Sequence, residues 1–170
     1  MTREGRRTVV GVMGGGTASA EVARMAEELG RLVAEAGWVL LTGGRPAGVM
    51  EAASRGARLA GGLVIGVLPG PDPDGASRYV DVAIATNLAD GRNLVNVLSS
   101  DVVIACPGGA GTLSEVAIAH KIGLPVASLS SWHPRRTGHP VPPITEFAEP
   151  EAAAAWAVEE AVARRRAGGR

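Results

Sequence analysis

Cysteine and lysine are almost absent from this 170-residue chain, and so is any long apolar run. Cys106 is the only cysteine, which excludes a disulfide framework within the chain. No stretch is apolar for long enough to act as an export signal or to span a membrane, so we expect a cytoplasmic protein. The length suits one domain with one sizeable core, and residues 1–170 are therefore predicted to form a single domain.

An excess of charge of either sign is also absent. Seventeen lysine and arginine residues balance seventeen aspartate and glutamate residues, so the formal net charge is zero. A balanced chain has no overall attraction to nucleic acid, to acidic substrates or to a membrane surface. We therefore expect neither nucleic acid nor a membrane as a partner.

Short aliphatic runs alternate with segments of helical period along the chain. Runs that are apolar throughout are typical of strands covered on both faces, and the alternation predicts an α/β fold. We expect three α/β/α layers around a mainly parallel sheet of about six or seven strands. The six runs that predict strands are residues 8–12, 38–41, 63–68, 79–85, 101–106 and 125–129.

Two segments show where helices and loops should lie. Apolar residues recur at three- and four-residue steps from Val22 to Ala36, which predicts an amphipathic helix that Gly37 ends. An alanine-rich segment at 151–166 predicts a closing helix. Residues 69–75 and 130–143 are rich in proline and predict irregular loops.

Glycines gather where three of the predicted strands end. In an open parallel sheet, ligands bind outside the carboxyl ends of the strands, and glycine lets backbone N–H groups approach an anion there. Each cluster alone could be only a tight turn, but three at one edge favour a phosphate site, although none spells a Walker A loop or the full dinucleotide fingerprint. The clusters are Gly14, Gly15 and Gly16, then Gly43 and Gly44, then Gly108, Gly109 and Gly111.

The third cluster runs into a predicted helix start. Thr112 and Glu115 have the spacing of a capping box, in which each side chain satisfies a backbone donor of the other. A carboxylate at that place could also face the ligand edge and act on a water or on a ribose hydroxyl. The sequence leaves both roles open.

The nine residues PGGAGTLSE at 107–115 match the PGGxGTxxE signature of the LONELY GUY family of cytokinin-activating phosphoribohydrolases. The segment TGGRPAGVMEAA at 42–53 is similar to the family's GGGxxGLM segment, and the resemblance runs from the first glycine cluster to about Pro125. It implies a Rossmann-like fold that assembles as a homodimer or a homotetramer and binds a nucleoside monophosphate at the strand ends.

The resemblance also implies residues and a reaction. Arg92 stands 23 residues before Glu115, as the family's catalytic arginine and glutamate do, so the two imply a catalytic pair. The implied reaction is hydrolysis of the N-glycosidic bond of a nucleoside 5′-monophosphate to free base and ribose 5-phosphate. The glycines of the third cluster and Thr112 would then bind the phosphate, and no cofactor would be required.

Three departures from the family pattern raise an alternative function. Asn93 stands where the family has a lysine, Arg45 replaces the third glycine of the GGG segment, and Glu51 replaces a later glycine. These changes bring the chain closer to a branch that includes the molybdenum cofactor carrier proteins. Those proteins bind a phosphate-bearing pterin without hydrolysing it, so a non-catalytic carrier is the second hypothesis, and whether the protein is an enzyme stays open.

Other chemistries have little support in the sequence. The family has long been mislabelled as lysine decarboxylases, but Lys121, the only lysine, fits a helix end better than a pyridoxal phosphate Schiff base. His120, His133 and His139 lack ligand-like spacing, so we expect no metal site. Cys106 should be a packed small residue rather than a nucleophile. Trp132, Arg135 and Arg136 could border the ligand or contact a neighbouring subunit, and the sequence does not decide between these two roles.

Overall fold

A computed structural model describes residues 6–135, 138 and 144–166 of the chain. Seven parallel strands form one sheet in the order β4-β3-β2-β1-β5-β6-β7. The chain runs through β1 (Val9–Met13), α1 (Ala20–Glu35), β2 (Val39–Thr42), α2 (Gly48–Leu59), β3 (Leu63–Leu68), β4 (Val82–Ala85), α3 (Arg92–Leu98), β5 (Val102–Ala105), α4 (Ala110–Lys121), β6 (Val126–Leu129), β7 (Thr145–Phe147) and α5 (Pro150–Arg166).

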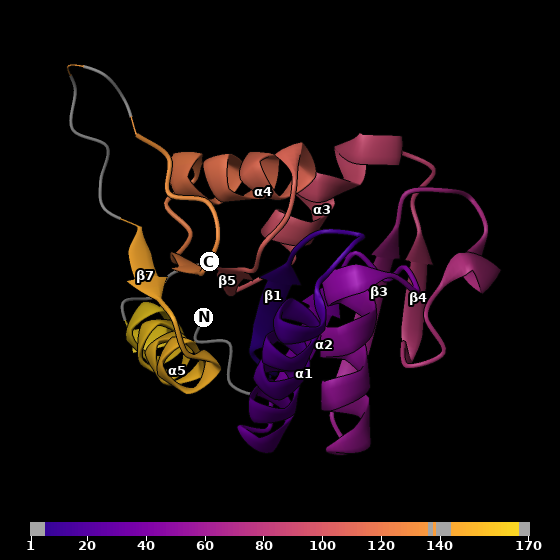
Figure 1. Cartoon of the computed structure of the whole chain (residues 1–170), viewed down its shortest axis with the longest axis horizontal. Coiled ribbons are helices and arrows are strands. Elements are labelled where there is room, and N and C mark those ends of the chain that lie inside the picture. The colour runs from indigo at the N-terminus through magenta and orange to yellow at the C-terminus, as the bar shows by residue number, and fades with distance from the viewer. Residues whose placement is uncertain (1–5, 136–137, 139–143, 167–170) are drawn as a thin grey trace.

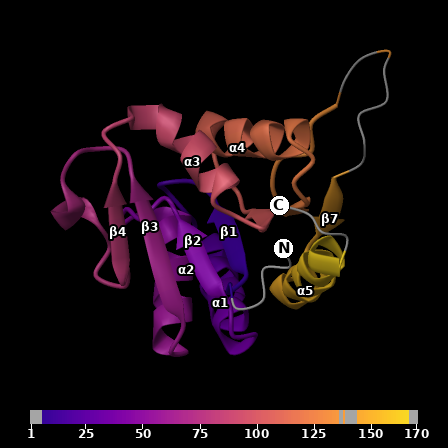
Figure 2. The ribbon, with the colours of Figure 1, turned by 180° about the vertical axis from the view of Figure 1, so that it is seen from behind.

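The helices cover both faces of the sheet and make a three-layer α/β/α fold (Figures 1 and 2). Helices α1, α2 and α5 pack with β1, β2, β3 and β5 into one aliphatic cluster, while α3 and α4 build a second cluster on the other face. Strands β1, β2, β5 and β6 are buried almost completely, as the apolar runs predict. The predicted Rossmann-like architecture is therefore confirmed.

Helices α1 and α2 lie side by side and approach each other through glycine (Figure 1). A Cβ at Gly30 of α1 would lie 2.1 Å from the carbonyl oxygen of Ala53, and a Cβ at Gly56 of α2 would lie 1.9 Å from the carbonyl oxygen of Glu27. Only glycine permits such backbone contact at these two places. The close packing sets the position of α2, whose first turn meets the loop after β1.

Most of the predicted elements are found, with two differences. The run at 79–85 forms a shorter strand, Val82–Ala85, and a seventh strand, Thr145–Phe147, lies outside the six runs that the sequence indicates. Among the described residues of 130–135 and 138, none belongs to a helix or a strand, as expected. Gly37 follows α1 with a φ of +77°, in the left-handed conformation that ends helices. That residues 1–170 form one domain stays a prediction.

A membrane-spanning helix is not found in the part of the chain that the structure describes, because no helix there is both long and apolar enough. The cytoplasmic location stays a prediction.

Candidate functional site

The strand order reverses between β1 and β5, and two of the three glycine clusters meet there. Strand β1 pairs with β2 on one side and with β5 on the other, which makes a topological switch point, the usual ligand position of an open α/β sheet. The N–H of Gly15 donates to the carbonyl of Pro107 at 3.0 Å, and the N–H of Val49 donates to the carbonyl of Gly15 at 3.0 Å. These bonds join the loops after β1 and β5 to the first turn of α2. Together with the loop after β2, which leads into α2, these segments are called here the glycine loops (residues 14–19, 43–49 and 106–109).

Several of these glycines are required by close packing. A Cβ at Gly108 would lie 2.7 Å from the backbone nitrogen of Gly15 and 2.2 Å from Oγ1 of Thr112, and a Cβ at Gly14 would lie 2.4 Å from Val49. Gly44 has a φ of +73° and packs against Gly66 of β3. At these positions close packing, or for Gly44 also a positive φ, is reason enough for glycine, whether or not the same loops also hold a ligand.

Two other glycines of the same loops face open space. A Cβ at Gly109 would meet no atom within 4 Å, and one at Gly16 would meet only the methyl carbon of Met50, at 4.0 Å. Both residues are exposed. Their backbones are therefore the parts of the glycine loops that a ligand can approach most closely.

Helix α4 begins earlier than the capping box requires. Its first residue is Ala110 and its N-cap is Gly109, with no side-chain capping bond, so the capping-box interpretation of Thr112 and Glu115 is wrong. The hydrogen bond from the N–H of Leu113 to the carbonyl of Gly109, at 3.1 Å, is the first of the helix. The N–H groups before Leu113 have no acceptor within the helix, and they add to the positive end of its dipole. This helix start is suited to bind an anion.

Glu115 is held by a side chain of the preceding helix. It is 5% exposed, and its Oε1 accepts a hydrogen bond of 2.7 Å from Nδ2 of Asn96, which is fully buried in α3. Burial raises the pKa of the Glu115 carboxyl, while the Asn96 hydrogen bond and the charge of Arg92 act in the opposite direction. Glu115 is thus a buried carboxyl whose ionisation depends on two neighbours.

Arg92 begins α3 and reaches back to the loop after β2. Its Nη1 lies 2.1 Å from the place where a Cβ of Gly43 would be, so the guanidinium rests on that glycine. Among the described residues, no ion pair or hydrogen bond joins the guanidinium of Arg92 to another group. Burial lowers the pKa of Arg92, the charge of Glu115 raises it, and the charge of Arg45 lowers it. A half-buried guanidinium without a partner is suited to receive an anionic group.

The three departures from the family pattern have different surroundings. Asn93, which replaces a lysine, is 7% exposed and donates from Nδ2 to Oγ of Ser114 at 2.9 Å, joining α3 to α4. Arg45 is exposed beside Arg92 and adds positive charge there. Glu51, in the first turn of α2, has a buried Oε2 without a hydrogen-bond partner among the described residues.

Trp132 borders the third glycine cluster. Its Nε1–H donates to the carbonyl of Gly108 at 2.9 Å and to that of Gly109 at 3.1 Å, while 39% of the residue is exposed. Ser131 adds a hydrogen bond of 2.6 Å to the carbonyl of Cys106. The strand-end segment after β6 is thereby joined to the loop before α4. Arg136, the third residue of this predicted border, lies outside the described residues.

Other side chains that the sequence singles out have packing roles. Cys106 is fully buried, and burial raises the pKa of its thiol to about 12, so it lacks the thiolate that a nucleophile needs. Lys121 is the last residue of α4, where a cation complements the helix dipole. Among the described residues no three histidine, cysteine or acidic side chains gather as metal ligands, and His139 lies outside them.

The structure therefore places Arg92 against Gly43, and the charge of Arg92 acts on Glu115, which lies in the helix that follows the third cluster. Sequence reasoning missed Asn96 as the partner of Glu115 and Trp132 as a donor to the loop. A signal for Asn96 existed, because polar residues recur at three- and four-residue steps in the otherwise apolar helix α3 and its end: Asn93, Asn96 and Ser100. Such a polar stripe on a buried face indicates side chains with specific partners.

A model of the SLOG cluster4 family matches residues 7–162. The chain belongs to the SLOG cluster4 family. The cytokinin riboside 5′-monophosphate phosphoribohydrolase of Mycobacterium tuberculosis is 32% identical over 121 residues, which are 66% of this chain. The chain covers 65% of that enzyme's length. The predicted resemblance to the LONELY GUY family is therefore supported as a distant relationship to these enzymes.

Two solved structures resemble the whole fold of this SLOG cluster4 protein. The molybdenum cofactor binding protein of the phototrophic bacterium Rippkaea orientalis superimposes with a TM-score of 0.83 and 42% identity, over 92% of this chain and 98% of that one. The molybdenum cofactor carrier protein of Chlamydomonas reinhardtii has a TM-score of 0.82 and 40% identity, over 93% of this chain and 99% of that one.

Proposed function

We propose that this protein binds a phosphate-bearing small molecule at the glycine loops, and that a pterin-type cofactor is the first candidate for that ligand. The observation that carries the proposal is the pairing of two unsatisfied anion-binding groups. The start of α4 has backbone N–H groups without helical acceptors, and Arg92 has no anionic partner in the described part of the chain. A phosphate group would satisfy both.

A carrier role is favoured by the residues that surround Glu115. Asn93 contributes no charge where the hydrolases have a lysine, and its amide is engaged by Ser114. Glu115 is only 5% exposed and its Oε1 is engaged by Nδ2 of Asn96, so little of the carboxyl is open to a substrate water. The molybdenum cofactor proteins also resemble this chain over more than nine tenths of its length.

Hydrolysis of a nucleoside 5′-monophosphate is the second candidate. It is favoured by Arg92 and Glu115, the pair that the resemblance to phosphoribohydrolases implies, because the charge of each acts on the pKa of the other. In this reaction the C1′–N bond of the ribose breaks, water adds to C1′, and the base leaves with a proton. The Glu115 carboxylate would stabilise the positive charge that develops on the ribose and orient the water. Arg92 would hold the phosphate.

The test compares binding with turnover. The wild-type protein and the Glu115→Gln variant are titrated by calorimetry with the molybdenum cofactor and with a panel of nucleoside monophosphates, and release of free base and ribose 5-phosphate is followed in parallel. The carrier function predicts binding without release in both proteins. Release by the wild type that disappears in the variant, while binding survives, would establish the hydrolase instead.

We also infer that the protein assembles as a homodimer or a homotetramer, as the family resemblance implies. Several large apolar side chains are exposed on α3 and just before it, where they would otherwise contact water: Leu88, Leu94 and Leu98. Light scattering behind a sizing column measures the assembly directly. A monomer at micromolar concentration would contradict this inference.

A further inference from the structure

Among the residues that the structure describes, the amide of Asn96 is the one side chain that donates a hydrogen bond to the Glu115 carboxylate. Asn96 is 0% exposed, and its Nδ2 donates to Oε1 of Glu115 at 2.7 Å, across the packed faces of α3 and α4. Its backbone is fixed as well, because Oγ of Ser100 donates to the Asn96 carbonyl at 2.8 Å. The Nδ2 donor is therefore restrained both by its bond to Glu115 and by the bond of Ser100 to the Asn96 backbone.

The other end of the same amide is unsatisfied. Oδ1 of Asn96 is buried and has no hydrogen-bond partner among the described residues. Buried amide oxygens usually have a donor, and leaving one unpaired opposes folding. Because Asn96 is buried despite this cost, we expect its hydrogen bond to the Glu115 carboxyl to have a role in the site.

An amide can serve either protonation state of a neighbouring carboxyl. Its N–H donates to the ionised form, as here, while its oxygen can accept from the protonated form if the amide turns over. The observed donation from Nδ2 favours the ionised form and so opposes the effect of burial. The charge of Arg92, from the start of α3, acts in the same direction, and Arg45 and Asp90 in turn act on Arg92.

We propose that Asn96 is a positioning residue that orients the Glu115 carboxyl and keeps it ionised beside the bound ligand. This proposal rests on the ligand site proposed above, because only that site gives the charge of Glu115 a use. In the carrier function, the charge of an ionised Glu115 acts on Arg92 without an ion pair between them, and it helps to keep the guanidinium charged until the ligand arrives. In the hydrolase, the ionised form is the one that stabilises the ribose cation and orients water.

The test follows Glu115 itself, through the pH titration of its ¹³C-labelled carboxyl by NMR. In Asn96→Leu the donor is lost, so we expect the titration midpoint of Glu115 to rise by about one pH unit or more. Asn93→Leu is the matched control, because Asn93 is also buried in α3 but donates to Ser114 instead of Glu115. The control midpoint should stay where the wild type has it.

A second variant covers the case that Asn96→Leu does not fold. Asn96→Asp is nearly isosteric and replaces the donor with a second carboxyl, so the pair should share a proton and the higher of its two midpoints should lie above the midpoint of wild-type Glu115. Equal midpoints in wild type, Asn96→Asp and Asn93→Leu would overturn the proposal, and so would equal shifts in both Asn96→Leu and Asn93→Leu.

Ligand binding provides the separate readout for the proposed function. The pH dependence of affinity for the molybdenum cofactor, or for whichever monophosphate binds, should move together with the Glu115 midpoint in Asn96→Leu. If no phosphate ligand binds the wild type, the proposed function fails while the NMR titration still decides the role of Asn96. If ligand binds but the midpoint is indifferent to Asn96, the positioning role alone fails.

Discussion

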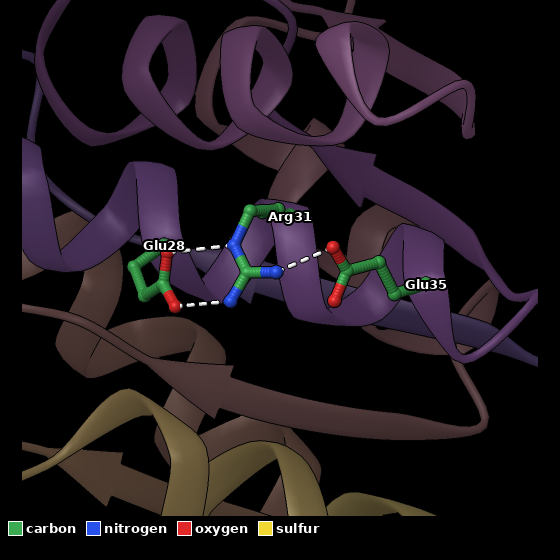
Figure 3. A network of polar contacts seen from close by, with 3 residues as sticks. All are labelled: Glu28, Arg31 and Glu35. Carbon is green, nitrogen blue, oxygen red and sulfur yellow. Dashed lines mark hydrogen bonds and ion pairs between the residues drawn. The ribbon is translucent and has the colours of Figure 1, made fainter.

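Two arginines of this protein have opposite surroundings. Arg31, on the outer surface of α1, lies between Glu28 and Glu35 and is bonded to both carboxylates (Figure 3). These hydrogen bonds raise the pKa of Arg31. Arg92 is half-buried against Gly43 and has no hydrogen-bonded carboxylate within the described residues, and burial lowers its pKa. One guanidinium is satisfied by its own helix, and the other is not.

The charge of Arg31 is paired on the protein surface, whereas the charge of Arg92 is available to a ligand. Spacings of three and four residues on a helix surface satisfy Arg31 locally, and such exposed pairs contribute little to stability. Arg92 lies where loops from distant parts of the sequence meet, and its burial has a cost without a compensating anion. A ligand that brings a phosphate would supply that anion.

Replacing each of the two arginines tests this comparison, and the largest change in ligand affinity is expected from Arg92. Arg92→Gln removes the unpaired charge, so affinity for a phosphate-bearing ligand should fall by about 10- to 100-fold. Arg31→Gln should leave the affinity unchanged. Calorimetric titration of both variants measures the effect, and equal losses in the two variants would show that Arg92 has no special role.

A change at Gly43 tests the position of Arg92 rather than its charge. In Gly43→Ala the new Cβ would lie 2.1 Å from Nη1 of Arg92 and 2.6 Å from Sδ of Met50, and both side-chain ends can move. The protein should fold, but the guanidinium would be displaced and affinity should fall by about tenfold. Gly70→Ala is the control, because a Cβ there meets nothing within 4 Å. Unchanged affinity in Gly43→Ala would contradict the described position of Arg92.

The raised pKa of Glu115 predicts a pH-dependent effect on stability. A folded state that binds the Glu115 proton more tightly than the unfolded state loses stability as pH rises above the ordinary glutamate pKa of about 4.3. Glu115→Gln removes this loss, so we expect its free energy of unfolding to exceed that of wild type by about 1 kcal/mol at pH 7. The difference should vanish near pH 4. Urea unfolding at several pH values measures it, and a variant less stable than wild type at pH 7 would refute the interpretation.

The smallest effect is expected at Trp132. Trp132→Phe keeps an aromatic ring but removes the Nε1–H that donates to Gly108 and Gly109. The loop before α4 should become less ordered, and ligand affinity should fall by about threefold to tenfold. Hydrogen exchange of the loop amides gives an independent readout. Exchange rates equal to those of wild type would mean that the indole does not restrain the loop.

Much of the fold could be predicted because the strands are apolar runs, the first helix has a clear period and the last is rich in alanine. The strand Thr145–Phe147 could not be predicted from the sequence. It is only three residues long and mostly exposed, so it has no apolar pattern to identify it. The start of α4 was misplaced for a related reason. Thr112 and Glu115 fit a local capping motif with Thr112 as the N-cap, but the N-cap is Gly109, three residues earlier, and Glu115 instead accepts a hydrogen bond from Asn96.

The candidate site, like the fold, has features that the sequence predicts and features that it does not. The glycine clusters are visible in the sequence because strand ends and glycines are local features. The contacts of Arg92 with Gly43, and of Trp132 with Gly108, join residues that are far apart in the chain. Local spacing carries no information about such pairs, so they appear only once the sheet order is known.

One titration tests the central claim most directly. Inorganic phosphate is added to the ¹⁵N-labelled protein, and the backbone amides of Ala110, Gly111 and Thr112 are followed by NMR in wild type, Arg92→Gln and Arg31→Gln. We predict saturable shifts of these amides in wild type and in Arg31→Gln. In Arg92→Gln the affinity for phosphate should be about 10- to 100-fold weaker. Shifts that are absent from the start of α4, or equal in all three proteins, would contradict the phosphate site.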